Sequence, residues 1–102
     1  MVKHVILWTL KEEFSAEEKE KIKAEMKESL EGLCGKVPGL LSLTVNIHPL
    51  PSSNAEVMLD STLDSEEALK GYAVHPAHVA VANEKVRPFT EVRLCMDYEV
   101  NP

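Results

Sequence analysis

Strand patterns at the two ends of this chain carry apolar side chains that need cover on both faces of a sheet. Residues 91–100 alternate strictly between polar and apolar, which predicts a strand with one apolar face. That apolar row consists of Val92, Leu94, Met96, Tyr98 and Val100. Residues 2–10 are almost wholly apolar or β-prone, which is typical of a strand buried on both sides. A sheet built from these strands needs more cover than one layer of helices provides.

The segment after the first strand predicts an amphipathic helix. Ser15 and Glu18 form a capping box, in which each side chain satisfies a backbone amide of the other residue. The apolar positions that follow recur at helical spacing and share one stripe: Ile22, Met26, Leu30 and Leu33. Gly35 is a candidate left-handed residue that stops the helix. One side of this helix therefore packs, and the other is charged.

The remaining segments predict further strands and helices. Residues 41–48 alternate apolar with polar, and residues 57–63 give a third strand. A short helix is expected to begin with Asp64 as its N-cap, and another runs from Pro76 to about Val86. The order strand, helix, strand, strand, helix pair, strand predicts an α+β fold of the ferredoxin-like, split βαβ type. In this fold the helices cover one face of a four-stranded antiparallel sheet.

The length of the chain favours one domain that gains stability from a second copy. With 102 residues there is room for one modest core, and we assign residues 1–102 to a single domain. The sheet face opposite the helices would expose a large apolar patch in a lone subunit. Burying that patch against its copy contributes roughly 25 cal/mol per Å² of apolar surface. We therefore predict a two-fold homodimer whose two sheets form a dimeric α+β barrel.

Composition and charge argue against several classes of partner. The net charge of −6 opposes contact with nucleic acid, and Arg87 and Arg93 form no basic stripe. No apolar run is long enough to cross a bilayer, and the first residues lack the pattern of a signal peptide. Cys34 and Cys95 are expected as free thiols, with a disulfide as the alternative. We therefore expect a cytoplasmic protein that binds neither nucleic acid nor membrane.

The segment from Tyr72 to His78 gathers a phenol and two imidazoles around a proline. Pro76 suits the first residue of a helix because it lacks the amide that a first turn leaves unpaired. His78 would lie near the positive end of the helix dipole, which favours a neutral imidazole that can act as a base. His75 is expected to cap this helix, with a role in ligand binding as the alternative. Tyr72 and His78 fit either a functional pair or a buried packing pair.

Residues from other segments are candidates for the same cavity. His4 would reach it if its side chain points with Ile6 and Trp8 toward the helices. Trp8 and Phe89 are candidates for the cavity wall, with plain core packing as the alternative. Imidazoles and carboxylates that could be drawn together as a metal site are His4, His75, His78 and either Asp97 or Asp60. Because no HExxH or cysteine pattern supports such a site, we predict no metal and no cofactor.

Four parts of the sequence resemble the stress-responsive A/B barrel (Dabb) domain family. They are residues 4–8 (HVILW), residues 64–69 (DSEEAL), residues 72–79, and the closing Met96-Asp97-Tyr98. The most specific part is the Tyr-x-x-His-Pro-x-His motif within residues 72–79, followed by the Asp-Tyr pair of the last strand. The resemblance spans nearly the whole chain and implies a dimeric α+β barrel, but it does not fix a function.

One branch of this family, similar to olivetolic acid cyclase, closes linear polyketides without metal or organic cofactor. The resemblance implies that Tyr72 and His78 carry the chemistry in such a protein and that Asp97 orients His78. A neutral imidazole would take a proton beside a carbonyl, a carboxylate would support the resulting cation, and a phenol would stabilise the enolate. The sequence departs from that branch at Val57, where a further histidine is expected.

Two classes of function follow. The first is a homodimer of the stress-protein kind that the resemblance implies, with a cavity for a small apolar or phenolic ligand. The second is a cofactor-independent enzyme of the cyclase or lyase type that acts on a polyketide-like or other small carbonyl substrate. A dimeric-barrel monooxygenase is a related alternative without a residue pattern of its own. An open pocket at Tyr72 and His78, with Asp97 behind the imidazole, would favour an enzyme, whereas a pocket filled by apolar side chains would exclude it.

Overall fold

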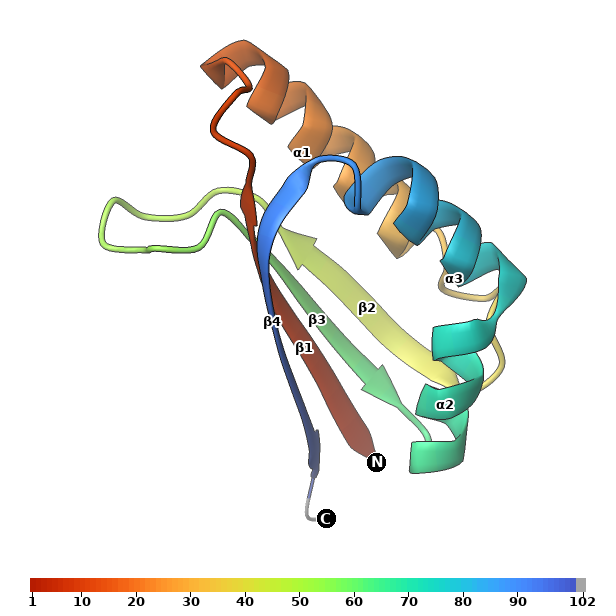
Figure 1. The fold of residues 1–102 in the computed structure, drawn as a ribbon. Coiled ribbons are helices and arrows are strands. Elements are labelled where there is room, and N and C mark those ends of the chain that lie inside the picture. The colour runs from red at the N-terminus through yellow and green to blue at the C-terminus, as the bar shows by residue number, and fades with distance from the viewer. Residues whose placement is uncertain (101–102) are drawn as a thin grey trace.

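The computed structural model describes residues 1–100 as a four-stranded antiparallel sheet with helices on one face (Figure 1). The strands lie in the order β2-β3-β1-β4, so the two central strands are the first and third along the chain. The elements are β1 (Val2–Leu10), α1 (Ala16–Glu31), β2 (Leu40–Asn46), β3 (Val57–Leu63), α2 (Glu66–Val74), α3 (Pro76–Val81), a π-helical turn η1 (Ala82–Val86) and β4 (Thr90–Glu99). The predicted ferredoxin-like α+β architecture is confirmed.

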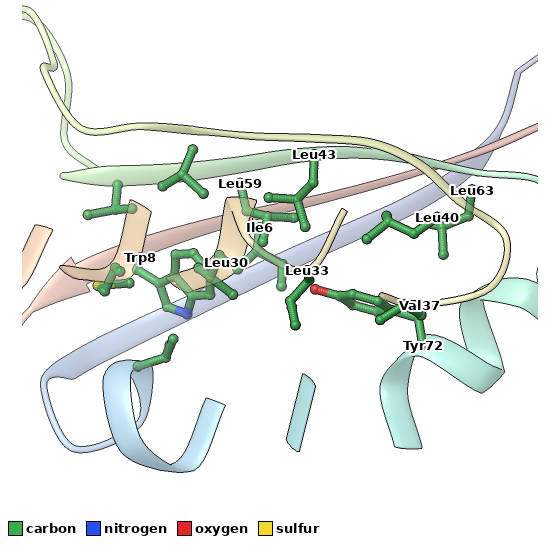
Figure 2. Packing of buried hydrophobic residues seen from close by; sticks show 14 of the residues in the cluster. Ile6, Trp8, Leu30, Leu33, Val37, Leu40, Leu43, Leu59, Leu63 and Tyr72 are labelled. Carbon is green, nitrogen blue, oxygen red and sulfur yellow. The ribbon is translucent and has the colours of Figure 1, made fainter. Parts of the chain in front are cut away.

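The core lies between the sheet and the helices. Alternate residues of β1 point toward the helices and are buried, among them Ile6, Trp8 and Leu10. The predicted stripe of α1 packs against them through Met26 and Leu30, as the close view of the cluster shows for Leu30 (Figure 2). Among the described residues, no helix has both the length and the apolar composition that a bilayer span requires. Side chains repeat every 2.0 residues in a strand and every 3.6 residues in a helix, so the apolar residues of β1 and α1 meet in one layer between sheet and helices.

Helix α1 begins as predicted but ends earlier. The Glu18 amide donates to Ser15 Oγ over 3.1 Å, and the Ser15 amide donates to Glu18 Oε1 over 2.8 Å, which completes the capping box. The helix ends at Glu31 with Gly32 as its C-cap, so the expectation that Gly35 stops it is wrong. Gly35 does adopt a left-handed conformation, with φ of 86°, but it does so within the turns that follow the helix. Glycine adopts positive φ without steric cost, so Gly35 allows the tight turns that connect α1 to β2.

The predicted start of α2 is wrong by one residue, because Ser65 rather than Asp64 is its N-cap. The Ser65 side chain accepts from the Ala68 amide over 3.1 Å. The Asp64 amide instead donates to the carbonyl of Gly39 over 2.9 Å, which keeps Asp64 tied to the turn before β2. Because the turn before β2 holds the backbone of Asp64, the next residue, Ser65, caps α2.

The sequence pattern also misplaces the apolar row of β2. Strict alternation put Leu41 on the same face as Leu43 and Val45, yet Leu41 is 54% exposed while Leu40 is buried. The pairing with β3 shifts register between Leu40 and Ser42. An irregularity of this kind adds a residue to one strand and moves the next side chain to the other face. Alternation read from the sequence alone cannot show where that happens.

The face of the sheet turned away from the helices is apolar and open. Leu94 and Met96 of β4 are exposed there, and they pair with Leu7 and Val5 of β1 on the same face. Figure 1 shows α1, α2 and α3 on one side of the sheet and no helix on the other. We call this surface the open face; its exposed apolar residues on β4 are Val92, Leu94, Met96 and Tyr98. The predicted uncovered apolar face is therefore present.

Candidate functional site

A cavity of about 380 Å³ lies between the sheet and the second half of the helical layer. Ile6, Trp8 and Leu59 from the sheet form much of its apolar wall, together with residues of every helical element. Its polar lining consists of His4, Tyr72, His78, Arg87, Thr90 and Arg93. The cavity is thus apolar in its depth and carries phenol, imidazole and guanidinium groups, a combination typical of sites that bind small molecules.

Tyr72 is the most deeply buried polar side chain of this cavity. It lies on α2, is 1% exposed, and its hydroxyl finds no hydrogen-bond partner within residues 1–100. In Figure 2 the hydroxyl of Tyr72 points into the core on the side of Leu33. Burial, with a smaller contribution from Cys34, raises the pKa of Tyr72 to about 12. The phenol therefore stays neutral and can donate a hydrogen bond to a bound oxygen atom.

The imidazole of His78 packs on the ring of Tyr72. Their centroids are 4.3 Å apart, and His78 Nδ1 lies 3.2 Å from the carbonyl oxygen of Ala73. Burial lowers the pKa of His78, the hydrogen bond to Ala73 opposes that shift, and nearby His4, Arg87 and Arg93 add to it. Because a carbonyl only accepts, the proton of the neutral ring sits on Nδ1 and Nε2 keeps a lone pair. Desolvation is thus the main cause that lowers the pKa of His78 and favours the neutral ring.

Asp97 pairs with His4, not with His78. The carboxylate Oδ1 lies 2.5 Å from His4 Nδ1, while the ring of His4 meets the ring of Tyr72 edge-on at a centroid distance of 5.9 Å. His4 and Asp97 are directly opposite each other in the β1–β4 ladder, which places both side chains on the helix-facing side. The expectation that Asp97 orients His78 is therefore wrong, because the backbone of Ala73 holds His78 instead.

The other predicted site residues divide between the cavity and its surroundings. His4 and Trp8 line it, and both point toward the helices as expected. His75 does not: its Nδ1 accepts from the Ala77 amide over 3.1 Å and caps α3. Phe89 does not line it either, because it packs against Phe14 at a centroid distance of 5.8 Å. A role in the cavity wall is thus wrong for His75 and Phe89.

Three residues that sequence reasoning passed over lie at this site. Arg87 and Arg93 line the cavity, and Cys95 lies beside the pair of His4 and Asp97. Arg93, Cys95 and Asp97 lie at alternate positions of β4 and therefore share one face of the strand. The alternation of the last strand could thus have predicted that Arg93 and Cys95 lie near Asp97. Within residues 1–100, His4, Cys95 and Asp97 are the one group of metal-ligating side chains that converges. The metal set drawn from His75, His78 and Asp60 does not come together.

Comparison with known proteins assigns the chain to a family. A model of the Stress responsive A/B Barrel Domain matches residues 2–100. A dimeric protein of unknown function with a ferredoxin-like fold from Bacteroides fragilis is 33% identical, with a TM-score of 0.89, over 97% of this chain and 95% of that one. No match was found among curated proteins.

Two further structures share the fold. The Arabidopsis thaliana protein At3g17210 is 24% identical with a TM-score of 0.79, over 100% of this chain and 97% of that one. A hydroxynitrile lyase from Passiflora edulis is 18% identical with a TM-score of 0.75, over 98% of this chain and 93% of that one. The family model and the Bacteroides relative agree with the geometry described above. The chain belongs to the stress-responsive A/B barrel domain family.

Proposed function

We propose that this protein is a homodimer whose cavity binds a small apolar molecule through a carbonyl or phenolic oxygen. The observation that carries the proposal is the Tyr72 hydroxyl, which is buried and unpaired within the described chain, on a side chain that lines the cavity. A buried hydroxyl without a partner is costly, so a site that keeps one gains most from a ligand that accepts its hydrogen bond. Tyr72 is therefore the residue expected to select the ligand.

The size and lining of the cavity support this class of ligand. Its volume of about 380 Å³ falls within the range of roughly 300–1,000 Å³ that is usual for small-molecule sites. Trp8 and Ile6 offer an apolar wall, while Tyr72 and the imidazoles offer a few directional groups. Arg87 and Arg93 favour a ligand whose oxygen carries partial or full negative charge. A phenol or an enolisable ketone of modest size satisfies all of these requirements.

The open face supports the dimer. A contiguous apolar row on β4, flanked by Val5 and Leu7 of β1, is unusual on a monomer surface. The Bacteroides relative is described as dimeric, and we expect the same two-fold pairing here. We also expect the protein to act in the cytoplasm, where reducing conditions keep Cys34 and Cys95 as the free thiols seen in the structure.

A second candidate function is cofactor-independent proton transfer, and the pair of His4 and Asp97 favours it. The carboxylate accepts from His4 Nδ1, so the lone pair of the neutral imidazole is on Nε2 and any cation formed there is supported by Asp97. Tyr72 would donate to the oxygen that gains charge. One neighbour of this fold is a hydroxynitrile lyase, although at 18% identity it supports the fold alone. In this candidate His4, rather than His78, is the base and Asp97 its positioning residue.

Ligand binding is tested by NMR titration of the full chain with a panel of phenols and small ketones. We expect resonances of Tyr72 and His78 to shift, and we expect Tyr72→Phe to weaken binding roughly tenfold, the worth of one hydrogen bond. Tyr98→Phe is the matched control, because it makes the same change on the open face. Equal binding by the two variants, or no shift with any compound, would contradict the proposal.

Proton transfer is tested with the same ketones in D₂O, where exchange of the proton beside the carbonyl is followed by ¹H NMR. A general base contributes typically 10²- to 10⁴-fold, so His4→Gln is expected to slow exchange by about that factor. Asp97→Asn is expected to slow it less and to change its pH profile, while His78→Gln is expected to retain it. Loss of exchange in His78→Gln alone would show that His78 is the base. Absence of exchange in the unmodified protein would reject the enzyme and leave ligand binding intact.

A further inference from the structure

We infer that His4, Cys95 and Asp97 form a binding site for a thiophilic divalent cation such as Zn²⁺. The three side chains lie on one face of the β1–β4 ladder, where His4 is directly opposite Asp97 and Cys95 is two residues before Asp97. One ligand atom from each residue falls within 4.8 Å of the other two. Neither the ligand cavity nor the dimer requires Cys95 at this position.

The distances already resemble those of a tetrahedral centre. With metal–nitrogen and metal–oxygen bonds of about 2.1 Å and a metal–sulfur bond of about 2.3 Å, neighbouring ligand atoms lie roughly 3.4–3.6 Å apart. Cys95 Sγ is 3.7 Å from His4 Nδ1 and 3.5 Å from Asp97 Oδ1. Only the contact of Nδ1 with Oδ1, now 2.5 Å, must open, by roughly 1 Å. Asp97 can make that movement because its side chain is partly exposed.

The chemistry of the three donors selects the class of metal. Imidazole, thiolate and carboxylate together are typical ligands of zinc and its neighbours, whereas Mg²⁺ and Ca²⁺ prefer oxygen atoms alone. Binding releases one proton from the Cys95 thiol, and the proton of the neutral His4 ring moves from Nδ1 to Nε2. The bound thiolate and carboxylate then balance the two positive charges of the ion. No oxidant or further reactant is needed.

The surroundings leave room for a fourth ligand. A groove of about 650 Å³ between β4 and α2 is lined by all three residues, and Glu66 and Glu99 also border it. Their carboxylates offset the unfavourable charge of Arg93, which lines the same groove. Three protein ligands and one open position are typical of zinc sites that bind water or a small ligand. The expected complex therefore contains one ion per chain with one exchangeable position.

The test uses Co²⁺ as a spectroscopic probe for the chelator-treated, reduced full chain. We expect one Co²⁺ per chain, a thiolate-to-metal charge-transfer band and the intense visible bands of a tetrahedral ion, all removed by Zn²⁺. Cys95→Ser should abolish the charge-transfer band and weaken binding at least roughly tenfold, and Asp97→Asn should weaken it similarly. Cys34→Ser, which changes the other exposed cysteine, should leave the spectrum unchanged.

Other outcomes would overturn the site. They are the absence of a charge-transfer band in the unmodified protein, a band that survives in Cys95→Ser, and a band that is lost in Cys34→Ser. Thermal melting followed by circular dichroism shows whether each variant is folded, and Cys95 is exposed enough for serine to be tolerated. As an independent measurement, Zn²⁺ should shift the ¹⁵N resonances of His4 in the unmodified protein and in Cys34→Ser, and Cys95→Ser should need at least roughly tenfold more Zn²⁺ for the same shift. A shift at the same Zn²⁺ concentration in Cys95→Ser would also count against the site.

Discussion

Strands β1 and β4 pair along nearly their whole length, yet they differ sharply in burial. The inward side of β1 is covered, with Trp8 only 4% exposed, whereas β4 is exposed along both of its sides, with Met96 66% exposed. β1 is central because it pairs with β3 and β4, while β4 is an edge strand. Both strands are rich in apolar side chains, so residue type does not explain the difference. The buried row of β1 points toward the helices, whereas the apolar row of β4 lies on the open face, so the face on which a row lies decides whether the protein's own helices cover it.

The same comparison explains where the site lies. His4 is on the covered strand and Asp97 is on the exposed one, and they meet across the ladder. The imidazole is thus largely desolvated while the carboxylate that holds it stays partly in water. A pair of this kind combines a fixed geometry with access for a ligand or an ion. The ladder between buried β1 and exposed β4 is therefore where reactive side chains are both held in place and accessible.

The largest effect is expected in the covered strand. Ile6→Ala should lower the free energy of unfolding by about 2–5 kcal/mol, because it leaves a cavity in a packed core. Urea denaturation measures this loss. Val5→Ala on the other side of the same strand is the comparison variant and should cost less, since Val5 is only partly buried. Equal losses for the two variants would contradict the proposed difference between the faces of β1.

The next effect concerns the exposed strand and the second copy. Leu94→Asp should weaken the dimer by roughly 1.5–3 kcal/mol per chain, the value of one buried apolar side chain. Sedimentation equilibrium across a range of concentrations measures this change. Val74→Asp places the same charge on an exposed apolar residue at the end of α2, away from the sheet, and should leave the dimer intact. If the unmodified protein is a folded, stable monomer at micromolar concentration, the predicted dimer is wrong.

A smaller effect on the free energy of unfolding is expected from removing the buried hydroxyl of Tyr72. Tyr72→Phe should keep the free energy of unfolding or raise it by about 1 kcal/mol, because it removes a buried hydroxyl without a partner. Thermal and urea unfolding measure the change. A loss of more than 1 kcal/mol would mean that the hydroxyl has a structural partner, and the ligand proposal would lose its main support. Tyr98→Phe on β4 should change the core stability little.

The smallest effect concerns pH. The folded-state pKa of His78 lies below the value of 6.5 that is expected for the unfolded chain. The unfolded state therefore binds more protons as the pH falls through 6.5, and the folded state loses stability in that range until His78 itself is protonated. His78→Asn should reduce this loss between pH 7.5 and pH 5.5, as measured by urea denaturation at both values. Identical pH slopes in the two proteins would contradict the shift.

Much of the fold followed from local patterns, and the errors have physical causes. The capping box of Ser15 and the proline start at Pro76 depend on neighbouring residues only, so the sequence was sufficient. The misplaced row of β2 and the cap at Ser65 depend on which amides the sheet holds, and that depends on strands distant in the sequence. At the site, Tyr72 and His78 were found through one compact motif. The partner of Asp97 was not, because the ladder register that places it opposite His4 joins residues 93 positions apart.

Local sequence patterns were enough to predict the order and type of the elements, the uncovered apolar row of β4 and the motif around Pro76. These features depend on side-chain periodicity and on backbone preferences that act over a few residues. Contacts between distant parts of the chain fix which imidazole meets Asp97 and bring Cys95 to this pair, and the folded structure places His75 and Phe89 outside the cavity. The physical reason is that strand register and edge position are settled by long-range pairing and packing, and no local pattern encodes the partner across a ladder.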